Sequence, residues 1–164
     1  MSEAKISPIK PEQASETRRM IYTVANSIFH DAPDTESAIA YYSKTWPLPD
    51  LDDIQGKYID KNGAFLVAVI DGKIIGSGAL NMLAESVCEV RRLWFLPEYQ
   101  GKGLGYRMMQ ALLAIARRKG YKIARLETSP AYQERAYRFY RRLGFYEIPR
   151  YGDEDDDIGM ELVL

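Results

Sequence analysis

Cysteine and histidine are almost absent from this chain of 164 residues. Cys88 is the single cysteine and His30 the single histidine. One cysteine excludes an intramolecular disulfide framework and a CxxC metal site. With one histidine besides, the ligands for a structural zinc site are missing, so we expect no metal.

Long apolar runs and a strong charge of one sign are missing too. No apolar stretch approaches the ~20 residues that span a bilayer, and residues 1–11 lack the apolar core of a signal peptide. The formal net charge of −1 gives no attraction for nucleic acid or anionic membranes. With 46% hydrophobic and 27% charged residues, the sequence predicts one ordinary globular domain, cytoplasmic, without a nucleic-acid or membrane partner.

The most informative segment that is present is Gln100–Gly105, with the sequence QGKGLG. It lies between a strand-like run, 89–96, and an amphipathic helix pattern, 106–119. A glycine-rich turn that opens a helix presents several backbone N–H groups, and the positive end of the helix dipole, to one point. Glycine lets a phosphate approach the backbone. The segment therefore predicts an anion site.

Several interpretations of this turn compete. A P-loop needs the spacing G-x-x-x-x-G-K-[ST], which is missing after Gly101, and no Lys-Ser or Lys-Thr pair follows a glycine in this chain. The dinucleotide fingerprint G-x-G-x-x-G is matched by Gly101 and Gly103 in its first half, and Glu127 is a candidate for the acidic residue that follows it. Tyr106, however, occupies the position of the third small residue. The pattern Q-x-x-G-x-G is satisfied at every specified position. An ordinary turn that caps a helix is the remaining alternative.

The periodicity of apolar residues predicts a mixed order of elements. Asp71-Gly72 is a strong hairpin signal. Gly76 and Gly78 suggest a bulge or a close backbone approach. The predicted strands are 5–9, 64–70, 73–83, 87–96, 121–127, 145–148 and 158–164, and the predicted helices are 11–29, 34–42, 51–58, 103–119 and 132–143. This order favours a single α/β or mixed α+β domain around one mixed sheet.

Two segments resemble the GNAT superfamily, the Gcn5-related N-acetyltransferases. Residues 89–105, EVRRLWFLPEYQGKGLG, are similar to that family's pyrophosphate-binding segment. Residues 136–145, AYRFYRRLGF, match its A-x-x-x-Y-x-x-x-G-F pattern, although Gln133 stands where the family often has Asn. The resemblance runs from about Gly63 to the C-terminus, and residues 1–62 carry no matching signature.

The resemblance implies a central, mostly antiparallel sheet flanked by helices, in which two strands splay apart around the cofactor. It also implies acetyl-CoA as cosubstrate, residues 63–164 as the acetyl-CoA-binding core and 1–62 as acceptor-side helices of one domain, 1–164. A homodimer is a further expectation, with no interface assigned. The implied cofactor-binding residues are Leu93, Trp94, Phe95, Gln100, Gly101, Lys102, Gly103, Leu104, Gly105, Gln133 and Tyr140.

Two residues are implied in catalysis. Tyr140 holds the family's tyrosine position, which implies a general acid for the leaving thiolate, and its alternative is a packed aromatic beside Tyr137. Glu89 holds a position used as general base, and an apolar strand would raise its pKa. Its alternative is a salt bridge to Arg91 or Arg92.

The sequence indicates least about the molecule that accepts the acetyl group. Tyr41, Tyr42 and Trp46 stand near acids, which suits an amine by cation–π and charge attraction, and the acidic run 153–157 adds to this. Plain packing of these aromatics and a solvated acidic loop are the alternatives. The sequence thus predicts an N-acetyltransferase that acts on a small-molecule or peptide primary amine, with a catalytically silent CoA-binding sensor or interaction module as the rival.

Overall fold

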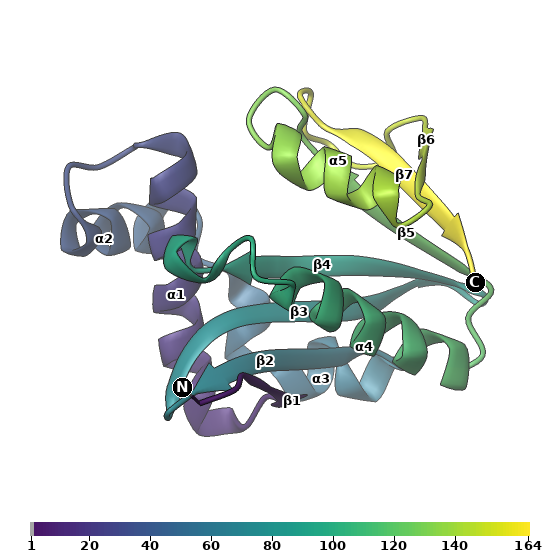
Figure 1. Ribbon diagram of the computed structural model, residues 1–164, viewed down its shortest axis with the longest axis horizontal. Coiled ribbons are helices and arrows are strands. Elements are labelled where there is room, and N and C mark those ends of the chain that lie inside the picture. The colour runs from purple at the N-terminus through teal and green to yellow at the C-terminus, as the bar shows by residue number, and fades with distance from the viewer. Residues whose placement is uncertain (1) are drawn as a thin grey trace.

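The computed structural model describes residues 2–164, so Met1, where the predicted domain begins, lies outside the described residues. Figure 1 shows the arrangement of the elements. The strands are β1 (Lys5–Pro8), β2 (Ala64–Ile70), β3 (Lys73–Ala84), β4 (Val87–Phe95), β5 (Ile123–Thr128), β6 (Tyr146–Ile148) and β7 (Ile158–Val163). The helices are α1 (Ala14–Phe29), α2 (Thr35–Thr45), α3 (Ile54–Lys57), α4 (Leu104–Arg118) and α5 (Glu134–Arg142).

One mixed sheet organises the molecule, in the order β1-β2-β3-β4-β5-β7-β6. Every neighbouring pair is antiparallel except β4 and β5, which are parallel. In Figure 1, α4 crosses in front of the sheet and α3 lies behind it. The predicted fold class, a mostly antiparallel mixed sheet flanked by helices, is confirmed.

The strands β4 and β5 separate after a short pairing. Their register joins Val87 to Ile123, Cys88 to Ala124 and Glu89 to Arg125, and the recorded pairing ends there. Beyond Glu89 the arm formed by β5, α5, β6 and β7 diverges from β4, as Figure 1 shows. The splay that the resemblance implied is therefore present, although no local pattern in the sequence indicated it.

Glycine positions in the central hairpin follow the sequence prediction. Asp71 and Gly72 both have positive φ, 49° and 80°, as a tight two-residue hairpin turn requires. A side chain at Gly78 would collide with Met108 and Leu112 of α4, and the β3–β4 register shifts at this residue. The missing side chain therefore lets α4 lie close to the sheet.

The first half of the chain differs in detail from its prediction. The segment 11–29 divides into one turn of 3-10 helix, Pro11–Gln13, followed by α1. The second predicted helix extends to Thr45, and Asp34 caps it by accepting a hydrogen bond from the backbone N–H of Ser37 at 2.8 Å. Residues 49–61 form three short helical pieces. No helix within residues 2–164 is long and apolar enough to cross a membrane.

Candidate active site

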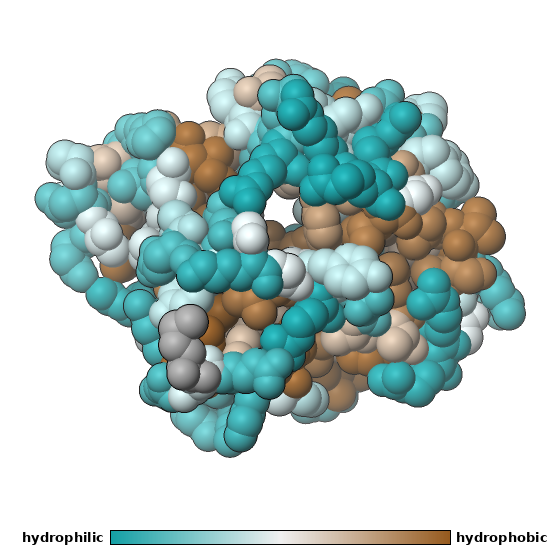
Figure 2. All heavy atoms as spheres, viewed as in Figure 1, coloured by the Kyte–Doolittle hydropathy of each residue, from teal (hydrophilic) through white to brown (hydrophobic). Residues whose placement is uncertain are grey.

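A cleft of about 870 Å³ lies where β4 and β5 diverge. In the space-filling view of Figure 2 this face is hollowed between the upper arm and the lower body, with hydrophilic residues at the rim. The lining comes from α1, β4, the turn after β4, the start of α4, β5 and α5. It comprises Val24, Ser27, Ile28, residues 90–95, Pro97, Tyr99, Gln100, Gly101, Gly103, Gly105, Tyr106, Leu126, Glu127, residues 132–136, Phe139, Tyr140, Arg142 and Leu143.

The glycine-rich turn forms one end of this cleft. Gly101 and Gly103 have φ of 76° and 81°, the left-handed conformation that glycine adopts without strain. Gly103 is the N-cap of α4, so the first N–H groups of that helix have no partner within the helix. The side-chain amide of Gln100 donates to the carbonyl oxygen of Phe95 at 2.8 Å and ties the turn to the end of β4. The anion site expected from the sequence therefore has the required backbone geometry.

Two arginines of α5 line the cleft, and sequence reasoning had singled out only Arg142, as a candidate contact of a cofactor phosphate with a solvated helix face as its alternative. Arg135 and Arg142 line the cleft from α5. A Cβ atom at Gly101 would lie 2.8 Å from a terminal nitrogen of Arg135, so the guanidinium stands directly over this glycine. By contrast, Lys102 lies over the ring of Tyr99 at 5.6 Å, and Leu104 is buried. Neither of the last two is among the lining residues.

Leu93, Trp94 and Phe95 lie along the β4 side of the cleft. Because the pairing with β5 ends at Glu89, the backbone edge of β4 that faces β5 is available to an extended ligand. Gln133 lines the opposite side, immediately before α5, and its backbone N–H donates to the carbonyl oxygen of Ser129 at 2.8 Å.

Tyr140 is buried at the base of α5 and lines the cleft. Its ring packs beside Phe139 and Phe145, at centroid distances of 5.6 and 6.1 Å. Burial raises the pKa of its phenol to about 12. The hydroxyl is therefore protonated at neutral pH, which is the state a proton donor needs. Core packing and the acid role are compatible for this residue.

Glu89 lies on β4 at the point where the two strands part, with its side chain only 14% exposed. The hydroxyl of Tyr151, from the loop between β6 and β7, donates to Oε2 of Glu89 at 2.7 Å. Burial raises the pKa of Glu89, and the hydrogen bond from Tyr151 and the charge of Arg91 limit that rise. A buried carboxylate with a raised pKa is a better proton acceptor at neutral pH than an exposed one. Nothing near Tyr151 in the sequence indicated this contact.

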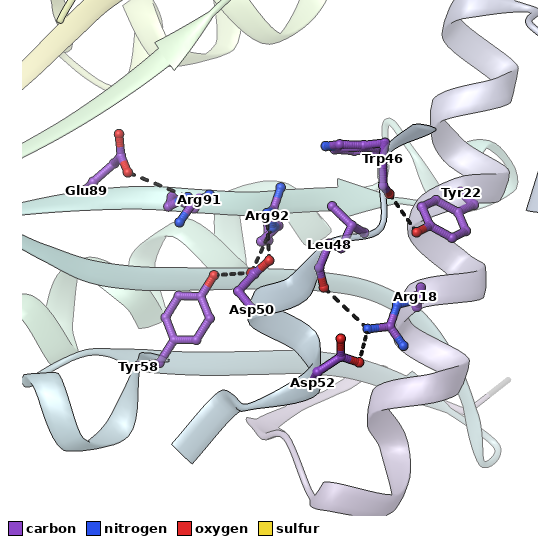
Figure 3. Close-up of polar contacts among 10 residues, drawn as sticks. All are labelled: Arg18, Tyr22, Trp46, Leu48, Asp50, Asp52, Tyr58, Glu89, Arg91 and Arg92. Atoms are coloured by element: carbon purple, nitrogen blue, oxygen red, sulfur yellow. Dashed lines mark hydrogen bonds and ion pairs between the residues drawn. The ribbon is translucent and has the colours of Figure 1, made fainter. Parts of the chain in front are cut away.

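The salt bridge considered for Glu89 exists only in a loose form. Nε of Arg91 lies 3.6 Å from Oε1 of Glu89, while Arg92 turns to Asp50 instead (Figure 3). The guanidinium of Arg92 donates to both carboxylate oxygens of Asp50, at 3.0 and 2.8 Å, and Tyr58 donates to the same carboxylate. Arg92 has a φ of 55°, so this buried network fixes an irregular turn of the β4 backbone inside the cleft.

The loop that carries Tyr151 is anchored by Glu127. The backbone N–H groups of Tyr151 and Gly152 donate to Oε2 of Glu127 at 3.3 and 2.9 Å. The acidic run that follows, 153–157, includes an exposed ion pair between Arg150 and Asp155. Glu127, the candidate acidic residue of the dinucleotide interpretation, holds this loop beside Glu89.

The aromatic residues expected to bind the acceptor pack with one another. Tyr42 is buried and donates to Oδ2 of Asp31 at 2.7 Å, whereas Tyr41 is 46% exposed. Trp46 contacts Trp94 of the cleft at a centroid distance of 6.0 Å, but none of the three predicted residues is itself among the lining residues. Their role in acceptor binding remains a prediction, with Trp46 nearest to the cleft wall.

The sequence is similar to those of known proteins. A model of the acetyltransferase (GNAT) family matches residues 31–145. An uncharacterized N-acetyltransferase of Escherichia coli, YjgM, is 33% identical over 103 residues, which cover 61% of this chain and 61% of that protein. The chain thus matches less than two thirds of that relative's length.

Solved structures resemble the fold over nearly the whole chain. An acetyltransferase of Streptococcus agalactiae has a TM-score of 0.81 and 22% identity, covering 98% of each chain. The PaiA N-acetyltransferase of Thermoplasma acidophilum, solved in complex with coenzyme A, has a TM-score of 0.77 and 23% identity, covering 99% of each chain.

Proposed function

Because the chain belongs to the acetyltransferase (GNAT) family, we propose that it transfers the acetyl group of acetyl-CoA to a primary amine. The observation that carries this proposal is the cleft itself. One space joins the glycine-rich turn, the open edge of β4 and Tyr140, and Glu89 stands where β4 and β5 part. Coenzyme A in the PaiA structure, which has this fold, supports the choice of ligand.

The residues that line the cleft suit the parts of coenzyme A. Its pyrophosphate matches the N–H groups at the start of α4 and the nearby charge of Arg135. Its pantetheine arm carries amides, which the open backbone edge of β4 can pair. A cleft of about 870 Å³ also lies within the usual range of ligand sites, about 300–1,000 Å³.

The proposed reaction forms a C–N bond and breaks the thioester C–S bond. Acetyl-CoA supplies an activated acetyl group. Glu89 accepts the proton that the amine must lose, and Tyr140 donates a proton to the departing thiolate. After one turnover Glu89 is protonated and Tyr140 is deprotonated, and exchange with solvent restores both. The amine attacks directly, because buried Cys88 has a pKa raised to about 11 and is a poor nucleophile at neutral pH.

The rival, a silent CoA-binding module, needs the turn but neither Tyr140 nor Glu89. The buried Glu89 carboxylate, held by Tyr151 with a raised pKa, favours the enzyme. The direct test incubates the protein with acetyl-CoA and an amine library and titrates the free thiol. We expect amine-dependent CoA release. Tight CoA binding without release for any amine would support the silent module instead.

The turn should control cofactor affinity. Gly103 has a φ of 81°, and a β-branched residue there costs about 1–3 kcal/mol of backbone strain or moves the N–H groups away from the ligand. Gly103→Val is therefore expected to weaken acetyl-CoA binding about 10-fold or more, measured by calorimetry. Gly120→Val is the matched control, since Gly120 has a φ of 91° but lies at the far end of α4. Near-normal CoA affinity in folded Gly103→Val would remove the basis of the proposal.

Arg135 should contribute charge at the same end of the cleft. Arg135→Gln is expected to weaken acetyl-CoA binding several-fold at low salt, with a smaller difference at 1 M salt, where the Debye length is about 3 Å. Arg138→Gln is the control, because Arg138 is 67% exposed and pairs with Glu134 on the outside of α5. Equal affinities of the Arg135 variant and the wild type at low salt would show that backbone groups alone bind the phosphates.

A further inference from the structure

Arg91 is a cation beside the proposed base, and its one recorded ion pair, with Glu89, is loose. It lines the cleft, and its side chain is 38% exposed. Its closest approach to a carboxylate of residues 2–164 is the 3.6 Å contact between Nε and Oε1 of Glu89. Within residues 2–164 no hydrogen bond is recorded for its two terminal nitrogens, so they can bind a ligand carboxylate in a bidentate manner. Figure 3 shows the two side chains next to each other on β4.

The other arginines near this end of the cleft are already neutralised. Arg92 is only 13% exposed and makes two hydrogen bonds to Asp50. Arg125 pairs with Glu161 at 2.7 Å. Arg135 stands over Gly101 at the phosphate end, and Arg142 lines the cleft from the last turn of α5. Among the arginines next to Glu89 in residues 2–164, Arg91 is therefore the one whose guanidinium can still take a ligand carboxylate.

Opposite Glu89, on the neighbouring strand β3, lies a side-chain oxygen that has no hydrogen-bond partner among residues 2–164. Asn81 of β3 is the register partner of Glu89, and side chains of directly opposed residues share a face of the sheet. Oδ1 of Asn81 is buried and has no hydrogen-bond partner among residues 2–164. Two acceptors of N–H donors, Glu89 and Asn81, thus lie beside Arg91, which is the one of the three that lines the cleft.

We propose that the acetyl acceptor is an amine that also bears a carboxylate a few bonds away, as a free amino acid does. Arg91 binds the carboxylate through its terminal nitrogens, while Glu89, assisted by Asn81, receives the amine. This inference rests on the proposed acetyl transfer and names the substrate class for it. Because Arg91 and Glu89 are two residues apart on one face of β4, the two charges of the acceptor must be close together.

The arrangement also disfavours other amines. A polyamine brings a second positive charge toward Arg91 and gains no carboxylate contact. A lysine side chain within a protein has its nearest carboxyl group consumed in the peptide bond. Both lack the group that Arg91 recognises, so the inferred preference separates free amino acids from these two acceptor classes.

The experiment compares matched acceptors that differ in the carboxylate alone. The free amino acids and the corresponding amino-acid amides are each offered with acetyl-CoA, together with two polyamines and a lysine-containing peptide, and CoA release is measured. The amides have the lower amine pKa and hence more free amine at neutral pH, so intrinsic reactivity works against the expected result. We expect at least one amino acid to exceed its amide by 10-fold or more in kcat/KM.

Variants then connect that preference to Arg91. Arg91→Gln should lower the ratio of kcat/KM for the preferred amino acid to kcat/KM for its amide by 10-fold or more, mostly through the KM of the amino acid. The ratio is the readout because Arg91 also holds down the pKa of Glu89, and a change in that pKa affects both acceptors alike. Arg91→Lys should restore the preference in part, since it keeps the charge but loses the planar fork. Arg138→Gln, on the outer face of α5, should behave as wild type.

The possible outcomes distinguish a failure of the proposed acetyl transfer from a failure of the proposed carboxylate site at Arg91. Turnover of polyamines, peptides or amides in preference to every amino acid keeps the acetyltransferase function and overturns the carboxylate site. An equal rise in KM for amino acid and amide in a folded Arg91→Gln protein also overturns it, because Arg91 would then not recognise the carboxylate. CoA binding without turnover of any acceptor overturns both.

Discussion

Tyr140→Phe is expected to lower kcat on the order of 10²-fold while leaving the affinity for acetyl-CoA almost unchanged. The change removes one hydroxyl and keeps the ring, so the packing against Phe139 and Phe145 is retained. The loss corresponds to the usual contribution of a positioned proton donor. Steady-state rates give kcat, and single-turnover measurements give the rate constant of the chemical step without interference from product release.

The environment of Tyr140 gives this expectation its physical basis. Burial alone raises its pKa to about 12, so the residue stays protonated across the neutral range and donates at the moment when charge develops on sulfur. We therefore expect the wild-type profile of kcat to show no ionisation of this tyrosine below about pH 10. A tyrosine with an ordinary pKa would already begin to lose its proton there.

Tyr137→Phe is the matched control for this experiment. Tyr137 lies three residues earlier on α5, donates to Glu147 and is not among the residues that line the cleft. Its variant should keep wild-type kcat. If Tyr140→Phe and Tyr137→Phe both retain full kcat, Tyr140 is a core aromatic and the thiolate receives its proton from water.

Local features of the site could be predicted because a few consecutive residues determine them. The turn at 100–105 combines a strand end, glycines with positive φ and a helix start, and each of these has its own sequence signal. Asp71-Gly72 predicted its hairpin for the same reason. Even the pKa direction of Glu89 followed from the apolar residues around it on the strand, and the structure agrees.

Features that depend on distant segments were not accessible. Tyr151 reaches Glu89 across 62 positions of sequence, and Arg135 stands over Gly101 because α5 folds back beside the turn. The aromatic residues of α2 show the opposite case. Their composition indicated an acceptor surface, yet Tyr42 satisfies its hydroxyl with Asp31 and packs inside. Long-range packing decides which face of an amphipathic segment meets a ligand, and a single sequence does not state it.

Glu89→Gln should lower the rate on the order of 10²-fold at neutral pH and recover in part as the pH rises. The amide cannot accept a proton, so the amine must lose its proton to solvent. This becomes easier near the amine's own pKa, about 10.4 for a lysine-like group and about 8 for the α-amino group of a peptide, with that of a free amino acid above the latter. A pH series of kcat/KM for wild type and variant measures the effect, and Glu147→Gln, on exposed strand β6, serves as control.

The low-pH side of the same kcat/KM series tests Glu89 as the base, through its hydrogen-bond partner Tyr151. In the wild type, activity should fall as the pH drops through the raised pKa of Glu89, above the ordinary value near 4.3. The hydroxyl of Tyr151 stabilises the charged carboxylate, so its loss in Tyr151→Phe raises that pKa further. The fall in activity at low pH should therefore move to higher pH in Tyr151→Phe and disappear in Glu89→Gln. Profiles of Glu89→Gln that run parallel to wild type at every pH would instead assign the proton to water or another carboxylate.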